Sequence, residues 1–167
     1  MRQKRNRFIA LAALLLLTAA PAAPQEAEKR VTLKGSSLSL PAPIRFGPGA
    51  DSLTPDSEKA LALVADFLKG RQSVTLLRVE GHVGGGEAEG AQKLSEQRAL
   101  AVARWLAEHG VACKRLVAVG FGATKPAAEN ESPDGRVEFT LAALNHRLLG
   151  GLPADGGGQS AGEVCQE

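Results

Sequence analysis

The sequence predicts an α/β two-layer sandwich, in which two helices pack on one face of a mixed β-sheet. Short apolar runs of strand length alternate along the chain with two longer segments of helical periodicity, in the order β-α-β-α-β-β. Each helical segment ends at a glycine, Gly70 or Gly110. The last strand, residues 137–141, alternates strictly, so one of its faces should be buried and the other wet.

In the first half of the chain, alternation and capping residues define the elements. Residues 31–33 and 38–40 alternate around a Gly-Ser-Ser turn, which predicts a short hairpin or two extended segments. Residues 43–46 predict a strand. Thr54 and Pro55 predict a helix start, because a threonine hydroxyl caps free backbone amides and proline suits the first helical position. The helix continues with apolar residues at helical spacing: Leu61, Val64, Phe67 and Leu68.

The second half repeats the alternation of strand and helix. Residues 74–80 predict a strand that ends in a glycine-rich loop at 81–86. A second helix is predicted from about residue 92 to residue 109, and a further strand at 116–119. The apolar stripe of the second helix is predicted at Leu94, Ala101, Val102, Trp105 and Leu106.

The first residues have the layout of a secretory signal peptide. Four basic residues precede an apolar run at 9–20, and small residues and prolines follow it. The run is shorter than the roughly 20 residues that span a bilayer, so a permanent membrane helix is the less favoured interpretation. We expect cleavage after Ala22, which makes residues 1–22 a signal peptide and exports the protein to the periplasm. No cysteine lies near the cut, so no lipid anchor is expected there.

The charge of the chain argues against a nucleic-acid partner. The formal net charge is +2, and residues 1–22 hold four basic residues and no acidic one. The exported part therefore carries +2 minus 4, or −2. It lacks the clustered basic face that nucleic-acid binding requires. A chain of 167 residues suits one domain with a proper core.

The segments that flank the core are poor in apolar residues. Residues 23–37 predict a polar linker with room for an extended segment, and residues 143–167 predict a flexible glycine-rich tail. Cys113 and Cys165 leave two alternatives open. They form a single disulfide, which an oxidising periplasm would favour, or they stay separate as a small residue after a helix and a thiol in the tail.

Arg98 is the residue that an amphipathic helix alone does not explain. It lies four residues after Leu94 and four before Val102, in line with the predicted apolar stripe. Burying an unpaired guanidinium is expensive. Three arrangements would relieve the cost: the side chain extends to solvent, it pairs with an internal carboxylate, or its planar fork holds an anionic group of a ligand.

Other kinds of site find little support in the sequence. The glycines at 84–86 lack the Lys-Ser/Thr ending of a P-loop and do not fit G-x-G-x-x-G, so no nucleotide is expected. His109, the histidine nearest to Cys113, has no orienting acid. Paired catalytic carboxylates and metal-ligand spacing are not visible. We therefore expect neither an enzyme nor a metal or cofactor.

An ordered series of short motifs runs through residues 38–142. They are Ile44-Arg45-Phe46, Leu53-Thr54-Pro55, Val79-Glu80-Gly81-His82, Leu94-Ser95-Glu96-Gln97-Arg98-Ala99, Gly120-Phe121-Gly122 and Gly135-Arg136-Val137-Glu138-Phe139. In this order and spacing they resemble the OmpA-like C-terminal domain, a wall-binding module of bacterial envelope proteins. The resemblance implies a two-layer α/β domain for residues 38–142.

The resemblance also implies a ligand, the peptide stem of peptidoglycan with the free carboxylate of diaminopimelate. In the family motif, an aspartate takes the ammonium of the ligand and an arginine takes its carboxylate. Arg98 matches that arginine, and Arg136 matches a second arginine near the same pocket. His82 matches the motif histidine, whereas the position of the aspartate falls on Val83 or Gly84.

Half of the implied ligand clamp is therefore missing. A ligand ammonium without its carboxylate loses a charge-assisted hydrogen bond of about 1.5–3 kcal/mol. Glu87, in the same loop, is the candidate substitute. The motif asparagine falls on Ala91, and Gly135 replaces the first arginine of the later motif.

The sequence thus predicts a non-enzymatic envelope protein that binds peptidoglycan through a weakened or altered site. The site residues are Arg98, Arg136, His82, Val83, Gly84 and Glu87. The alternative is a degenerate domain of the same family that serves as a protein-interaction or scaffold unit in an envelope complex. We expect a periplasmic location, and leave open an association with the outer membrane or with envelope membrane proteins.

Overall fold

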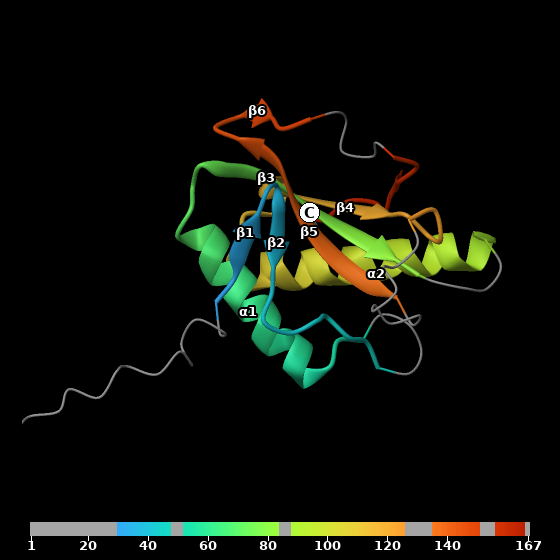
Figure 1. Cartoon of the computed structure of the whole chain (residues 1–167). Coiled ribbons are helices and arrows are strands. Elements are labelled where there is room, and N and C mark those ends of the chain that lie inside the picture. Colours follow the sequence, from blue (N-terminus) through green and yellow to red (C-terminus); the bar gives the residue numbers. More distant parts are fainter. Residues whose placement is uncertain (1–29, 48–51, 84–87, 126–134, 151–155, 166–167) are drawn as a thin grey trace, which may run out of the picture.

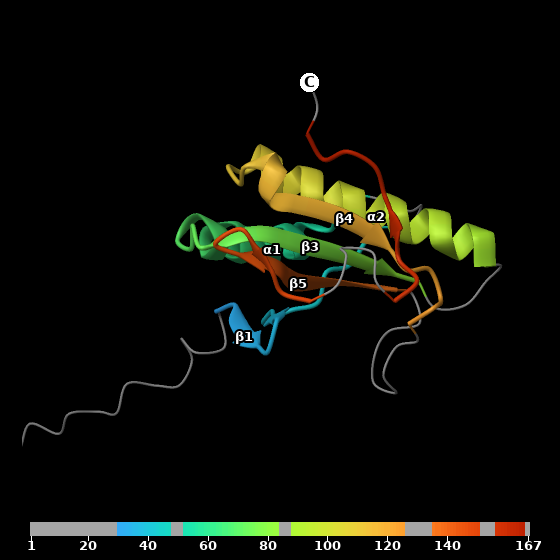
Figure 2. The same ribbon diagram turned by 90° about the horizontal axis from the view of Figure 1, so that it is seen from above.

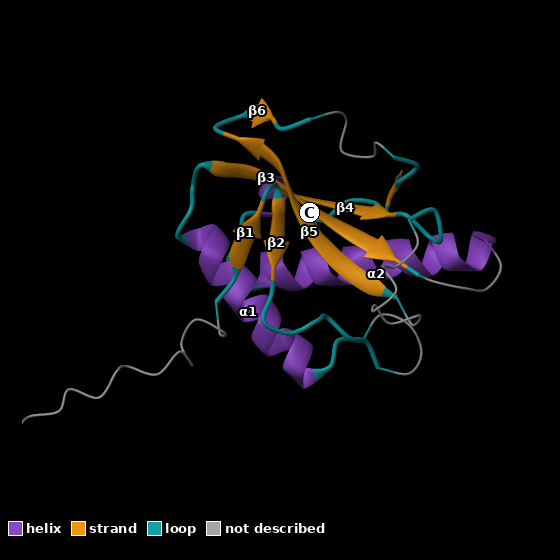
Figure 3. Cartoon of the chain, in the orientation of Figure 1, coloured by secondary structure: helices purple, strands orange, loops and turns teal. Residues whose placement is uncertain are grey.

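The computed structural model describes residues 30–47, 52–83, 88–125, 135–150 and 156–165. Helices and strands alternate along the chain, with two α-helices and seven strands among these residues (Figures 1 and 3). The elements are β1 (Thr32–Lys34), β2 (Ser37–Ser39), α1 (Pro55–Lys69), β3 (Val74–His82), α2 (Ala88–Glu108), the short 3-10 helix η2 (Cys113–Arg115), β4 (Leu116–Gly120), β5 (Arg136–Leu144), β6 (Arg147–Leu148) and β7 (Gln159–Ser160).

The strands form one mixed sheet in the order β1-β2-β5-β3-β4-β7, with β6 paired to β5. The long strands β3 and β5 are antiparallel neighbours, and β3 and β4 run parallel. Seen from above, β5, β3 and β4 follow one another and α2 lies beyond β4 (Figure 2). The predicted mixed sheet with two helices is confirmed. Of the two alternatives for the N-terminal segments, the structure shows the hairpin, because β1 and β2 pair antiparallel.

Helix α1 begins as its capping residues predict. The Thr54 hydroxyl accepts a hydrogen bond from the Ser57 backbone N–H at 3.4 Å, and Pro55 takes the first helical position. Gly70 follows the last turn, and its N–H donates to the Asp66 carbonyl. The apolar residues predicted for this helix, Leu61, Val64, Phe67 and Leu68, are all buried in the core.

Helix α2 lies very close to the sheet because small residues meet at the contact. A Cβ atom on Gly81 of β3 would collide with the Ser95 carbonyl, and one on Gly120 of β4 would lie 2.7 Å from the Glu96 backbone nitrogen. The prediction of the apolar stripe was partly wrong, since Leu94, Ala101 and Trp105 are only half-buried. The buried face consists of Ala91, Ser95, Ala99, Val102, Ala103 and Leu106.

The two helices share one hydrophobic core with the sheet. Leu77 and Val79 of β3 and Phe139 and Leu141 of β5 contribute their side chains to it. Because successive strand residues point to opposite faces, the residues between them lie on the other face of the sheet. That second face carries the polar side chains of β3 and β5, including Glu80.

One predicted strand and the predicted domain limits differ from the structure. Residues 43–46 do not form a strand of the sheet, and only Phe46 makes an isolated bridge, to Leu53. The sheet also extends beyond the predicted domain limits of 38 and 142, from β1 to β7.

Among the described helices, none has both the length and the apolar composition to cross a membrane.

The described part of the C-terminal segment, in contrast to the prediction of a flexible tail, is tied to the domain. Strand β7 pairs with β4, and the Ala161 N–H donates to the Ala118 carbonyl at 3.0 Å. Val164 is buried in the core. Cys165 forms a disulfide with Cys113, which decides between the two alternatives for the cysteines.

Candidate ligand-binding site

Arg98 lies on α2 beneath the end of the sheet where β5 begins. Its guanidinium carbon is 4.8 Å from the ring centroid of Phe46, so the cation stacks on an aromatic face. A Cβ atom built on Gly135 would lie 2.7 Å from its Nη1. The residue is half-buried and is not extended into bulk solvent. We call Arg98, Phe46, Val83 and Gly135 the helix-side site.

The packing of α2 explains this placement. Ser95 and Ala99, which flank Arg98 on the helix, are fully buried against the sheet. Their small side chains bring the helix axis close to β3, so a long side chain at the edge of the buried face reaches past the sheet. The position of Arg98 therefore follows from the small residues around it.

Gly135 makes room for the arginine. Its φ is +95°, a conformation that L side chains rarely adopt, and a Cβ atom there would lie 2.5 Å from the His82 carbonyl oxygen. The same atom would lie 3.4 Å from the Val83 Cα. The sequence showed Gly135 only as a missing motif arginine, whereas the structure shows that backbone and guanidinium occupy the space a side chain would need.

A second group of polar side chains lies on the opposite face of the sheet. The register pairs Glu80 with Glu138 and His82 with Arg136, so all four side chains share one face of β3 and β5. Phe121 stacks on the His82 ring with centroids 5.2 Å apart. We call this group the sheet-side cluster, and it consists of Arg78, Glu80, His82, Lys125, Arg136 and Glu138.

Ion pairs hold the carboxylates of the sheet-side cluster. Arg78 donates to Glu80 Oε1 at 2.8 Å through Nε, and Lys125 Nζ donates to Glu80 Oε2 at 3.3 Å. Arg136 Nε donates to Glu138 Oε1. Glu80 is only 2% exposed, so these partners stabilise a carboxylate that would otherwise be costly to bury.

Burial and charge move two pKa values in this cluster. Desolvation raises the pKa of Glu80, but hydrogen bonds from Thr140 and Arg78 and the charges of Arg78 and Lys125 outweigh it, and the pKa lies below its usual value. Burial, aided by the Arg136 charge, lowers the pKa of His82 to about 4. His82 is thus neutral at pH 7.

The structure divides the predicted site residues between the two faces. Arg98 and Val83 come together around Gly135, whereas the side chains of His82 and Arg136 lie in the sheet-side cluster. Only the carbonyl oxygen of His82 borders Gly135. Gly84 and Glu87 lie outside the described residues.

Sequence reasoning missed three contributors to these sites. The sequence placed Phe46 in a motif and a strand, whereas in the structure its ring stacks against the guanidinium of Arg98. Glu80 and Glu138 approach His82 only because of the β3–β5 register. The strict alternation of the last strand was the signal that could have placed Arg136 and Glu138 on one face, away from the core.

The fold recurs in solved structures of bacterial proteins. An outer membrane protein from Borrelia burgdorferi B31 is similar with a TM-score of 0.54 at 25% identity, covering 70% of this chain and 96% of that chain. The periplasmic domain of Helicobacter pylori MotB has a TM-score of 0.55 at 18% identity, covering 69% of this chain and 81% of that chain, a likeness of fold alone. The fold thus defines a small two-layer α/β domain of the kind these proteins contain.

The chain belongs to the OmpA family, whose model matches residues 45–139. The outer-membrane lipoprotein YfiB of Pseudomonas aeruginosa is 34% identical over 112 residues, which cover 66% of each chain. The peptidoglycan-binding protein ArfA of Mycobacterium tuberculosis is 37% identical over 97 residues, 58% of this chain and 29% of ArfA. The chain spans less than two thirds of the length of either relative.

Proposed function

We propose that this domain binds peptidoglycan without covalent attachment, as an exported protein of the periplasm, and that Arg98 receives a carboxylate of the peptide stem. The observation that carries the proposal is the half-buried guanidinium of Arg98, held between Phe46 and the Gly135 backbone at the end of the sheet. A relative of the same family, ArfA, is named for binding peptidoglycan.

The chemistry of this position suits a carboxylate ligand. A guanidinium presents parallel N–H groups that match the two oxygens of a carboxylate. The Phe46 ring covers one face of the cation, so a ligand carboxylate would approach the guanidinium at its edge. Partial burial lowers the local dielectric, so a charge-assisted hydrogen bond there is stronger than one in bulk water.

The altered clamp makes the proposed interaction weak. Val83, one of the two positions that align with the motif aspartate, is an apolar residue and is buried. A ligand ammonium therefore finds no carboxylate at this position, and the lost hydrogen bond lowers affinity by roughly one to two powers of ten. Glu87 is the proposed replacement.

A pulldown on purified peptidoglycan tests the proposal. Arg98→Ala should reduce retention about ten- to a hundredfold, because it removes a charge-assisted hydrogen bond of about 1.5–3 kcal/mol. Arg71→Ala is the matched control, since Arg71 also stacks on an aromatic ring, with its guanidinium carbon 4.1 Å from the Phe67 centroid. Its retention should equal that of the wild type.

Equal retention of wild type and Arg98→Ala would overturn the proposed role of Arg98. If the wild-type protein is not retained at all, but co-purifies with a membrane protein in the absence of peptidoglycan, the domain is a scaffold unit in an envelope complex. Thermal unfolding of each variant shows whether a loss of retention reflects a loss of fold.

A further inference from the structure

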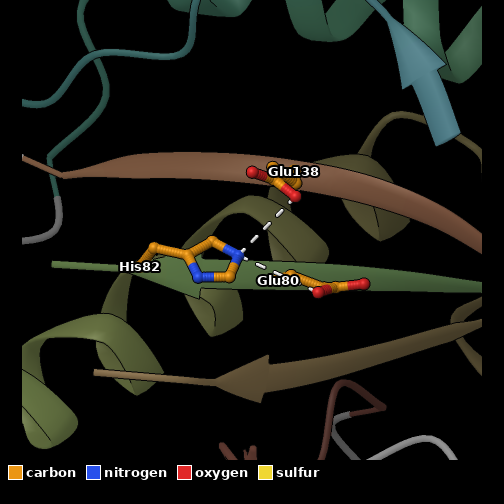
Figure 4. Close-up of side chains that lie close together, drawn as sticks. All are labelled: Glu80, His82 and Glu138. Carbon is orange, nitrogen blue, oxygen red and sulfur yellow. Dashed lines mark ion pairs between the residues drawn. The ribbon is translucent and has the colours of Figure 1, made fainter. Parts of the chain in front are cut away.

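Three groups that commonly bind metal ions converge on the face of the sheet away from the helices. His82 Nε2 lies 3.8 Å from Glu80 Oε2 and 3.9 Å from Glu138 Oε2 (Figure 4). One ligand atom from each of the three residues can be chosen so that all lie within 4.8 Å of one another. These distances are too long for hydrogen bonds, so His82 Nε2 is not hydrogen-bonded to either carboxylate.

His82 itself lacks a hydrogen-bond partner. Its side chain is only 1% exposed, and neither Nδ1 nor Nε2 has a partner among the described residues. A buried polar group without a partner costs about 1–3 kcal/mol, so the two nitrogens call for an explanation, and a bound ion is one of those known for such groups. A neutral imidazole has a lone pair on one of its two ring nitrogens, which is the atom that coordinates a metal ion.

Both carboxylates are oriented toward the imidazole. Glu80 Oε1 accepts a hydrogen bond from Arg78, and Glu138 Oε1 accepts one from Arg136. The Oε2 atom of each carboxylate lies toward His82 Nε2. The arginines therefore act as outer partners that fix the carboxylates without occupying the inward oxygens. Figure 4 shows an imidazole nitrogen facing Glu80 of the same strand, β3, and Glu138 of the neighbouring strand, β5.

We propose that Glu80, His82 and Glu138 form a binding site for a divalent transition-metal ion, best suited to Zn²⁺. Zinc binds imidazole nitrogen and carboxylate oxygen at about 2.0–2.2 Å, so two ligand atoms of one ion lie up to about 4 Å apart. The separations of 3.8 and 3.9 Å fall within this limit, and the widest separation in the group, within 4.8 Å, has to shorten when the ion binds. Glu138, whose side chain is 41% exposed, opens the site to an incoming ion and to a water as fourth ligand.

The surrounding cations set how tightly the site binds. Lys125 shares Glu80 Oε2 with the proposed ion, so zinc must displace the ammonium. The Lys125 side chain is 36% exposed and can turn to solvent. The charges of Arg78 and Arg136 remain and oppose a further positive charge. We therefore expect an exchangeable ion and not a permanent structural one.

Calorimetric titration of the purified chain with zinc chloride, without a histidine tag, tests the site. The wild type should bind one ion, and Glu138→Gln should bind at least about tenfold more weakly, because the amide keeps the shape but loses the charged ligand. The double variant His109→Gln, His146→Gln is the matched control, because both of these histidines are exposed. Its binding should match the wild type.

A second measurement does not depend on any variant. The ¹⁵N resonances of the His82 ring should shift on addition of zinc, as the metal takes the Nε2 lone pair. Absence of binding, equal binding by Glu138→Gln, loss of binding in the double histidine variant, or an unchanged His82 ring would each overturn the proposal. No peptidoglycan enters these experiments, so their outcome is independent of the proposed wall binding.

Discussion

The two faces of the sheet use arginine in different ways. On the helix side, Arg98 is held by an aromatic ring and by the space that Gly135 leaves. On the other face, Arg78 and Arg136 pair with acidic side chains of the same sheet. Neighbouring residues at one end of a strand can therefore serve separate sites, because successive β-strand residues point to opposite faces of the sheet.

The largest predicted effect concerns the sheet-side cluster and pH. The pKa of His82 is about 4 in the folded protein and about 6.5 in an unfolded chain, so the unfolded state binds more protons between these values. Stability is fully present above pH 6.5 and should fall by up to about 3 kcal/mol as the pH drops to 4. Urea unfolding at several pH values measures this loss.

Matched variants sharpen that prediction. His82→Phe should flatten the dependence between pH 6.5 and 4, because no imidazole remains to titrate at this position. Below that window the lowered pKa of Glu80 still makes stability fall with acid. His109→Gln should keep the wild-type profile, since His109 lies outside the cluster. A profile of His82→Phe identical to the wild type would contradict the assignment to His82.

The next effect concerns the helix-side site. Gly135→Ala should lower stability by about 1–3 kcal/mol, because the new side chain meets strained backbone and crowds the His82 carbonyl. It should also displace Arg98 and reduce retention on peptidoglycan. Gly150→Ala is the control, since Gly150 also has a positive φ, +120°, but nothing lies within 4 Å of an added Cβ. If both variants lose retention equally, crowding of Arg98 is not the cause.

The smallest effect concerns the ring of Phe46. Phe46→Leu keeps an apolar contact but removes the cation–π interaction, which is worth about 0.5–1 kcal/mol at a partly exposed position. Retention on peptidoglycan should fall about two- to fivefold. Phe67→Leu, beneath Arg71, should leave retention unchanged. A Phe46→Leu variant that binds as well as the wild type would show that the ring contributes packing alone.

Local signals in the sequence predicted the order of the elements. The cap at Thr54 and the apolar spacing of α1 depend on neighbours a few residues apart, and both were correct. The alternation around a turn predicted a hairpin or two extended segments at residues 31–40, and the structure forms the hairpin of β1 and β2. Such features need no knowledge of the rest of the molecule.

The division of the site could not be predicted in the same way. The family motif places Arg98 and Arg136 near one pocket, but the face on which a strand residue lies depends on its register with β3. The defined structure of residues 156–165 depends on pairing with β4, which is distant in the sequence, and on the Cys113–Cys165 disulfide. Glycine-rich composition alone predicts flexibility and gives no information about such contacts.

The covalent link near the C-terminus also bears on how copies of this protein behave at high concentration. The disulfide lies close to β7, which pairs with the last residues of β4. Backbone groups of Ala118, Val119 and Gly120 along this edge therefore already face the C-terminal segment. An exposed edge strand presents unpaired backbone groups, with which a strand of another chain can pair and start aggregation. We expect reducing agents to break the disulfide, free β7 from the edge of β4 and raise the tendency of the protein to aggregate.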